Sequence, residues 1–357
     1  MSHKRLLIPG PTESPVEILQ QQTRWLIGHR SADYTALYTG IIDKLGKYFE
    51  TQQNRTVLTA SGTIWMDMTA RNMVKDRALA GVCGAFSKRM YETIRDSGKQ
   101  VDPLKVENGQ AIKPEMVMEA LSKNTYDTVA IVHNETSTGV RNPIEEIGQA
   151  IKKEYPDIMF VVDAVSSAGG DYLVPEKLNT DIMFTSTQKC FALPPGLSIG
   201  FYSDAAIERA KTVTGRGYYT DLVAVHDYYQ KKQQNPTTPN ISLMYALDYQ
   251  LDRMLKEGPK ARYERHLAMA QYTREWAGKK MKMFPEPGYE SVTVSTIANT
   301  LGKDIGALNK ELGKRGYQIA NGYGDLKEKT FRIGHMGEWN LNEIKSLLWH
   351  IDEIWGE

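Results

Sequence analysis

The sequence is poor in cysteine, has almost no net charge and lacks a long apolar run, and each of these absences excludes some classes of protein. Only Cys83 and Cys190 occur among 357 residues, so at most one disulfide can form and a disulfide framework is excluded. The 44 lysines and arginines balance 43 acidic residues, a net charge of +1, so we expect no nucleic-acid or membrane surface held by bulk charge. No apolar run approaches the ~18 residues of a membrane span.

Targeting and metal-binding patterns are missing as well. Met1 to Arg5 are not followed by an apolar signal-peptide segment, and we expect a cytoplasmic protein. The seven histidines are scattered, without a His-x-x-x-His pair, and the cysteines form no cluster, so we expect no metal site. What is present is a globular mix, 41% apolar and 24% charged, with length enough for two domains.

Residues 56–203 alternate between short apolar, β-rich runs and segments of helical character. The expected strands are Thr56–Ala60, Thr128–His133, Met159–Asp163, Asp181–Thr185 and Leu197–Tyr202, and the expected helices include Ile64–Val74 and Ile144–Tyr155. The runs show little polar alternation, which is typical of strands buried on both faces. This order predicts an α/β fold with a mainly parallel sheet that carries helices on both sides.

The pattern changes near residue 240, where longer helices begin. The expected elements are helices Ser242–Lys256 and Ala261–Met283, strand Ser291–Ile297, helix Ile305–Arg315, strand Thr330–Ile333 and a helix from Leu341, with Asn340 as N-cap and Glu343 at its third position. We therefore predict a large domain over residues 15–242 and a smaller C-terminal α+β domain over residues 243–357. Residues 1–14 are expected to pack near the small domain.

Residues whose side chains could bind a ligand or take part in catalysis directly follow the ends of the expected strands. They are Ser61-Gly62-Thr63, Glu135-Thr136, Asp163 and Gln188-Lys189. In open parallel α/β sheets, ligands bind at the carboxyl ends of the strands. We therefore expect these residues to share one site.

Lys189 and Asp163 are the strongest candidates for chemistry. A lysine in a partly dry pocket has a lowered pKa and can attack a carbonyl as an amine, whereas an ordinary lysine lies on the surface. Asp163 ends an apolar run, where a plain turn or cap residue is also found. Pyridoxal 5′-phosphate (PLP) enzymes need both groups, because a carboxylate opposite the pyridine nitrogen keeps the ring able to accept electrons. We therefore interpret the pair as a PLP site.

Three further features suit such a cofactor, although each has an ordinary structural alternative. Ser61-Gly62-Thr63 precedes a helix and can bind a phosphate with backbone N–H groups and hydroxyls, or can simply cap the helix. Phe86 can stack on a planar ring or belong to the core. Arg332 can bind a carboxylate with two hydrogen bonds or lie on the surface.

At these residues the chain resembles the class V aminotransferases, which have the fold type I architecture of PLP enzymes. The resemblance runs from Leu6-Leu-Ile-Pro-Gly-Pro-Thr12 to Arg332-Ile-Gly-His-Met-Gly337, nearly the whole chain. The other matching motifs are Gly28-His-Arg-Ser31, Ser61-Gly-Thr63, His133-Asn-Glu-Thr-Ser-Thr-Gly139, Asp163, Ser186-Thr-Gln-Lys-Cys190 and Pro194-Pro-Gly196. The closest groups are the alanine–glyoxylate, serine–glyoxylate and serine–pyruvate aminotransferases. The resemblance implies a mainly parallel sheet of seven strands.

The resemblance also implies a role for each site residue. By this resemblance, Lys189 forms the Schiff base with PLP and Asp163 pairs with the ring nitrogen. Phe86 stacks on the ring, and Thr136 lies beside the ring hydroxyl. Arg332 binds the substrate carboxylate, with Gly28 and His29 on the substrate side. The residues that bind the phosphate are Ser61, Gly62, Thr63 and Gln188. Thr237 or Thr238, in Asn235-Pro-Thr-Thr-Pro239, reaches the phosphate of a second subunit, which implies a homodimer with shared active sites. Some relatives carry a tyrosine where this chain has Gln234.

The implied activity is a ping-pong transfer of an amino group from a small amino acid, alanine or serine, to a 2-oxo acid, glyoxylate or pyruvate. Phosphoserine aminotransferase is an alternative, for which the candidate phosphate-binding cations are His29, Arg30, His335, Lys327 and Lys329. A class V desulfurase or lyase requires a cysteine on a mobile loop, and neither Cys83 nor Cys190 suits that place. A fold relative without catalysis is the last alternative, and the presence of Lys189, Asp163 and Arg332 argues against it.

Overall fold

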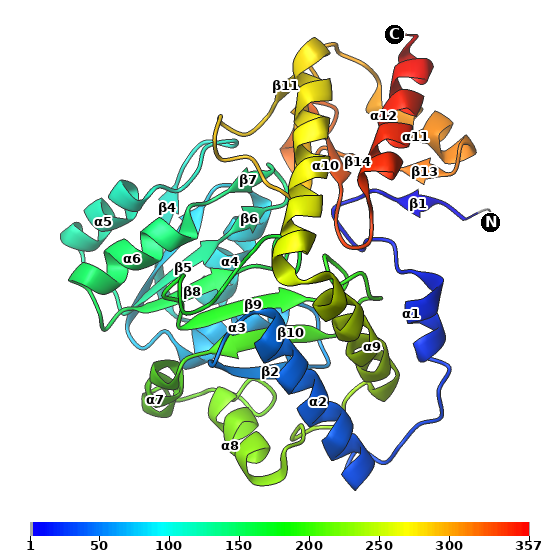
Figure 1. The fold of residues 1–357 in the computed structure, drawn as a ribbon. Helices are drawn as coiled ribbons and strands as arrows, with labels where there is room; N and C mark the ends of the chain where they lie inside the picture. Colours follow the sequence, from blue (N-terminus) through cyan, green and yellow to red (C-terminus); the bar gives the residue numbers. More distant parts are fainter. Residues whose placement is uncertain (1–2, 357) are drawn as a thin grey trace.

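The computed structural model describes residues 3–356 and contains a seven-stranded sheet at its centre (Figure 1). The strands lie side by side in the order β2 (Asn54–Leu58), β10 (Ser198–Tyr202), β9 (Ile182–Ser186), β8 (Met159–Asp163), β5 (Thr128–Val132), β3 (Arg77–Val82) and β4 (Gln100–Lys105). Strand β10 runs antiparallel to both of its neighbours, and the pairs from β9 to β4 are parallel. The expected mainly parallel seven-stranded sheet is confirmed.

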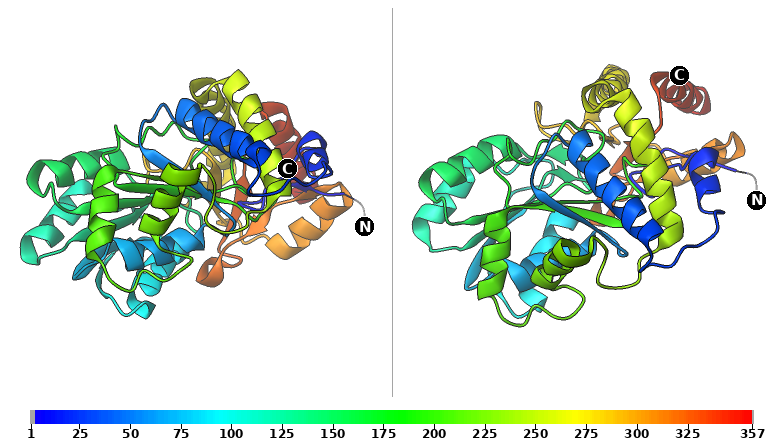
Figure 2. Two further views of the ribbon diagram at one scale, coloured as in Figure 1. Left: turned by 90° about the horizontal axis from the view of Figure 1, so that it is seen from below. Right: turned by 60° about the horizontal axis from the view of Figure 1, so that its bottom comes forward.

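Helices cover both faces of this sheet, as two further views show (Figure 2). One face packs against α2 (Ala32–Tyr48), α5 (Pro114–Lys123), α6 (Ile144–Glu154) and α9 (Ile241–Glu257). The other face packs against α3 (Thr63–Asn72), α4 (Ala85–Asp96), α7 (Asp204–Thr212) and α8 (Leu222–Lys232). All five residues of β5, β8, β9 and β10 are buried, which explains why their sequences lack polar alternation.

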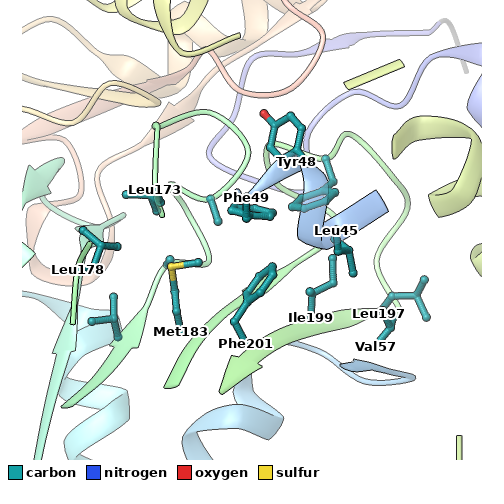
Figure 3. Packing of buried hydrophobic residues seen from close by; sticks show 14 of the residues in the cluster. Leu45, Tyr48, Phe49, Val57, Leu173, Leu178, Met183, Leu197, Ile199 and Phe201 are labelled. Atoms are coloured by element: carbon teal, nitrogen blue, oxygen red, sulfur yellow. The ribbon is translucent and has the colours of Figure 1, made fainter. Parts of the chain in front are cut away.

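Side chains that alternate along the strands build two separate cores. Phe160 and Val162 of β8 point into the core under α2 and α9, whereas Val161 between them joins the core under α3 and α4. Figure 3 shows part of the first core, where Met183 and Phe201 of the sheet lie beneath Phe49, at the end of α2.

A second body of structure contains the C-terminal elements and the first strand. Its sheet has the order β11 (Lys282–Met283), β12 (Val294–Ala298), β15 (Thr330–Gly334) and β14 (Ala320–Asn321), and β1 (Arg5–Leu6) pairs with β13 (Tyr317–Gln318). Helices α10 (Pro259–Lys280), α11 (Ile305–Lys314) and α12 (Leu341–Trp355) accompany this sheet. The remaining elements are α1 (Val16–Gln21), the hairpin of β6 (Asn134–Glu135) and β7 (Val140–Arg141), and a 3₁₀ turn at Gly324–Leu326.

The two long helices α9 and α10 pack into different hydrophobic cores. The buried residues of α9, such as Leu247 and Leu251, belong to the core of the large sheet, whereas Met269 and Ala277 of α10 belong to the C-terminal core. Leu7 also lies in the C-terminal core. The boundary at residues 242 and 243 stays a prediction.

Most of the expected elements differ from the structure by one to three residues at an end; the strand predicted to begin at Ser291, for example, begins at Val294. The helix predicted for Ala261–Met283 ends at Lys280, because Lys282 and Met283 pair with β12 as strand β11. Strand β2 begins at Asn54 and ends at Leu58, so Thr59 and Ala60 belong to the turn toward the site. The last helix begins as expected, with Asn340 and Glu343 forming a reciprocal capping box. Among residues 3–356, no helix is both long and apolar enough to cross a membrane.

Candidate active site

A cavity of about 410 Å³ lies where β2, β5, β8 and β9 end. Eight of the predicted site residues line it: Ser61, Gly62, Thr63, Phe86, Thr136, Asp163, Gln188 and Lys189. They come from segments that are up to 128 residues apart in the sequence, from position 61 to position 189. The cavity is therefore assembled by the sheet, at the edge where parallel α/β proteins bind ligands.

Lys189 lies in this cavity with only 8% of its surface exposed. Burial is the main reason why the pKa of its ammonium group is lowered to about 8, while the nearby Asp163 carboxylate acts in the opposite direction. The Lys189 amine donates a hydrogen bond to the Pro9 carbonyl. A substantial fraction of this amine is therefore neutral near pH 8 and can act as a nucleophile or base.

Asp163 is the last residue of β8 and is 4% exposed. Burial raises the pKa of its carboxyl group to about 7, and the negative charge of Glu135 acts in the same direction. One carboxylate oxygen accepts a hydrogen bond of 2.8 Å from the Val165 amide. A cation placed against this carboxyl would lower its pKa again, so the group is suited to hold a positively charged ring nitrogen.

Gly62 allows the chain to pass close to its neighbours at the start of α3. A Cβ atom at this position would lie 2.8 Å from Val165 Cγ2 and 3.4 Å from Ser186 Cβ. Gly62 is the N-cap of α3, and Thr63 is its first helical residue. Ser61, Gly62 and Thr63 thus bring a helix N-terminus and two hydroxyls to the cavity, the donors that suit a phosphate.

The remaining predicted residues of the cavity are held by neighbours. Gln188 accepts a hydrogen bond of 2.5 Å from the Ser186 hydroxyl, and the Thr136 hydroxyl lies 2.5 Å from that of Ser166. Phe86 lies in the first turn of α4. An amine, a carboxylate, a phosphate-type turn and an aromatic ring in one cavity fit the groups that PLP requires.

Arg89 is a residue of this cavity that the sequence reasoning missed. It lies one turn after Phe86 on α4, with its guanidinium carbon 4.8 Å from the centre of the Phe86 ring. Its position three residues after the aromatic candidate was the available signal, because residues at that spacing share a helix face. Gly10 and Pro11 also line the cavity, although they come from the N-terminal segment.

Arg332 lies beside the cavity and is not among its lining residues. Its guanidinium donates from Nη1 to the Thr136 carbonyl at 3.2 Å and from Nε to the Asn321 carbonyl at 3.1 Å. The Tyr323 ring lies 5.5 Å away, and burial lowers the pKa of Arg332 to about 10. Hydrogen bonds to two backbone carbonyls therefore orient the guanidinium of Arg332, the only cationic side chain of β15.

The model of the family described as Aminotransferase class-V matches residues 18–288 of this chain, which is more than half of its length. The chain belongs to this family. An uncharacterized aminotransferase of Methanocaldococcus jannaschii is 41% identical, with 97% of this chain and 91% of the relative covered. The serine–glyoxylate aminotransferase of Methylorubrum extorquens is 32% identical, over 96% of this chain and 88% of the relative.

The solved structures agree with the family assignment. The alanine–glyoxylate aminotransferase of Nostoc sp. superposes with a TM-score of 0.93 at 26% identity, covering 99% of this chain and 96% of that one. The resemblance stated from the motifs is thereby confirmed, as are the fold and the classification of the chain as an aminotransferase of class V.

Besides Arg332, four predicted residues of this class V aminotransferase do not line the cavity within one chain. Gly28 and His29 precede α2, and Thr237 lines a second cavity of about 190 Å³ next to the exposed Thr238. The two segments pack together, because Arg30 donates to the carbonyls of Asn235 at 2.5 Å and Pro236 at 2.7 Å. Gln234 donates to the Thr35 hydroxyl at 2.8 Å.

The cations considered for a substrate phosphate are not gathered in the cavity. Arg30 is hydrogen-bonded to the carbonyls of Asn235 and Pro236. His335 is fully buried beside the Ser295 hydroxyl, and burial lowers the pKa of its imidazole to about 3. Lys327 and Lys329 are exposed near the 3₁₀ turn. None of these side chains lines the cavity in the described part of the chain.

Both cysteines of the aminotransferase are buried and free. Burial raises the pKa of each thiol to about 12, which disfavours the reactive thiolate. Neither lines the cavity. These positions give no support to a desulfurase.

Proposed function

We propose that the protein binds PLP through Lys189 and transfers an amino group from a small amino acid, alanine or serine, to glyoxylate or pyruvate. The observation that carries this proposal is the presence of the buried Lys189 and Asp163 side chains in one cavity, each with a pKa moved toward neutrality by burial. Perturbed pairs of this kind are typical of active sites. The names of relatives, such as serine–glyoxylate aminotransferase, support the substrate class.

The proposed binding roles follow from the cavity. Ser61, Gly62, Thr63 and Gln188 would hold the phosphate, Phe86 would lie on the ring, and Thr136 would lie beside its hydroxyl. Asp163 would face the ring nitrogen. Bound PLP supplies an electron sink for the pair of electrons left when the substrate Cα–H bond breaks. Arg332 would bind the substrate α-carboxylate, with Gly28 and His29 on the substrate side.

Lys189 would move the proton. With its amine free and neutral, Lys189 would accept the proton from the substrate Cα as a general base, and the resulting ammonium would then donate that proton as a general acid. Its lowered pKa lets one group act first as base and then as acid near neutral pH. Lys189 and Asp163 are only 8% and 4% exposed, so little water would reach either group during this transfer.

A homodimer with shared active sites is part of this proposal. Thr237 and Thr238 do not line the cavity within one chain, and an exposed aromatic side chain lies beside Thr237. Tyr218 lines the same second cavity as Thr237 and is 88% exposed, and Trp25 is 94% exposed. Such large exposed apolar side chains suit a face that a second copy covers. The division into domains at residues 242 and 243 is likewise proposed.

The direct test is the visible absorbance of the purified protein with PLP. We expect a visible band in the wild type that is lost in Lys189→Ala. A wild-type protein that takes up no PLP would overturn the proposal. Half-reactions with alanine, serine and phosphoserine, followed by glyoxylate, pyruvate and 2-oxoglutarate, then identify the substrates. Conversion of phosphoserine alone would favour the alternative of a phosphoserine aminotransferase.

A further inference from the structure

Glu135 is a fully buried carboxylate whose short contacts are all with N–H and O–H donors. One oxygen accepts from the Phe86 amide at 3.2 Å and from the amide and hydroxyl of Ser137 at 3.1 and 2.7 Å. The other oxygen accepts from the amide and hydroxyl of Ser87 at 2.8 and 2.7 Å. Burying a carboxylate is costly unless its oxygens are satisfied in this way.

These contacts cap helix α4 from a distant part of the sequence. Gly84 stands at the N-cap and has no side chain to satisfy the first N–H groups of the helix. The Ala85 amide donates to the Ser137 hydroxyl at 2.9 Å, while the next two amides donate to Glu135. A negative charge at a helix N-terminus is also favoured by the helix dipole. The hairpin of β6 and β7 thus supplies the cap that the helix lacks.

Gly84 is required for this close approach. A Cβ atom at position 84 would lie 2.5 Å from Glu135 Cγ and 2.5 Å from Ser137 Oγ. The glycine therefore lets the carboxylate reach the helix end, and the carboxylate compensates for the missing N-cap side chain. The two features act as one unit.

The capped turn carries two residues of the cavity. Phe86 donates its own amide to Glu135, and Arg89 follows on the same helix face. We propose that Glu135 is a positioning residue that holds the Phe86 ring at the PLP site through the first turn of α4. The inference rests on the proposed function, since it concerns the residue proposed to stack on the cofactor. Glu135 itself does not line the cavity.

The test compares two Glu→Gln variants at carboxylates that accept hydrogen bonds from similar donors, one buried at Glu135 and one exposed at Glu176. In Glu135→Gln, an NH₂ group replaces one acceptor oxygen and faces backbone N–H donors. Glu176 is the control, because its Oε1 accepts from the Thr51 hydroxyl at 2.8 Å and from the amides of Gln52 and Gln53 at 2.7 and 3.1 Å, away from the cavity. We expect Glu135→Gln to weaken PLP binding about ten-fold, and Glu176→Gln to change it less than about two-fold.

A double variant separates positioning from a general loss of stability. If Glu135 acts through Phe86, the effect of Glu135→Gln on PLP affinity should disappear in a Phe86→Leu background. Fully additive effects in that background would overturn the proposal. Ser137→Ala is a milder variant that can be used if Glu135→Gln does not fold. It removes the hydroxyl that donates to Glu135 and accepts from the Ala85 amide. We expect this variant to weaken PLP binding as well.

A measurement without cofactor keeps this inference distinct from the proposed function. The protein contains eight phenylalanines, so ¹⁹F spectra of protein labelled with fluorophenylalanine allow Phe86 to be assigned by its loss in Phe86→Leu. We expect this resonance to shift or broaden in Glu135→Gln and to be unchanged in Glu176→Gln. An unchanged resonance in both variants would overturn the positioning role. Failure of the wild type to take up PLP would overturn the proposed function, while this spectrum would still decide the relation of Glu135 to Phe86.

Discussion

Arg332 donates a hydrogen bond of 3.2 Å to the backbone carbonyl of Thr136, although 196 residues separate them in the sequence. The contact joins β15 of the C-terminal sheet to the loop that follows β6, at the margin of the cavity. A second carbonyl, that of Asn321, binds the same guanidinium. The arginine is therefore oriented by the backbone of both parts of the chain before any substrate arrives.

Arg332→Lys should weaken the recognition of the substrate carboxylate. A lysine has the charge but not the planar fork that binds a carboxylate with two hydrogen bonds while keeping its carbonyl partners. We expect kcat/KM for amino acids to fall by about 10²-fold, corresponding to roughly 3 kcal/mol. Steady-state kinetics of Arg332→Lys would show this loss mainly in KM. Arg315→Lys, at an exposed position beside His350, is the control, and an equal loss there would contradict the assignment.

Asp163 should make the stability of the cofactor-free protein depend on pH. Its folded-state pKa, raised to about 7, lies above the ordinary value of 3.8, so the folded state binds more protons between these values. Stability is therefore highest below pH 4 with respect to this group and falls as pH rises toward 7. The full loss is up to about 4 kcal/mol.

Asp163→Asn should abolish this dependence. Denaturant unfolding of both proteins from pH 4 to 8 should show the variant gaining stability relative to wild type as pH rises. Asp325→Asn, at an exposed position in the 3₁₀ turn, serves as the surface control and should follow the wild type. A constant difference between wild type and Asp163→Asn across this range would show that the carboxyl is not titrating as described.

Gly62→Ala should disturb the proposed phosphate turn by crowding alone. The backbone of Gly62 has φ −56°, which alanine adopts readily, so only the 2.8 Å approach of Val165 Cγ2 opposes the new methyl group. We expect a loss of about 1–3 kcal/mol in stability together with weaker PLP binding. The additional substitution Val165→Ala should restore much of both.

A helical glycine without close neighbours provides the comparison for this pair. No atom lies within 4 Å of a Cβ at Gly278 in α10, and Gly278→Ala should stabilise the protein by roughly 0.5–1 kcal/mol. Thermal unfolding and PLP titration measure both effects. If Val165→Ala rescues nothing, crowding is not the cause.

Shared active sites predict complementation between two inactive variants. We expect Lys189→Ala and the double variant Thr237→Ala/Thr238→Ala each to have little activity. In a mixed dimer, one site would combine the intact lysine of one subunit with the intact threonines of the other. Random mixing of subunits in a two-fold dimer would then restore about a quarter of wild-type activity. Activity that stays at the level of the separate variants after verified subunit exchange would argue against sharing.

Much of the framework could be predicted because it depends on local pattern. Strand β8 was predicted with its observed bounds, since five consecutive buried residues lack polar alternation. The capping box of Asn340 and Glu343 was visible because both partners lie within one turn. The end of α10 could not be predicted in this way. The local sequence allows Lys282 to continue the helix or to form a strand, and only the position of β12 decides between them.

The sequence by itself determined the alternation of strands and helices, and with it the arrival of Lys189, Asp163 and the Ser61–Thr63 turn at one edge of a sheet. This follows from short-range periodicity and from the rule that parallel strands share their direction. Only the tertiary structure decided that Glu135 caps the helix of Phe86 and that Thr136 orients Arg332. Those contacts depend on distances between segments that are remote in the chain, and local pattern contains no information about such distances.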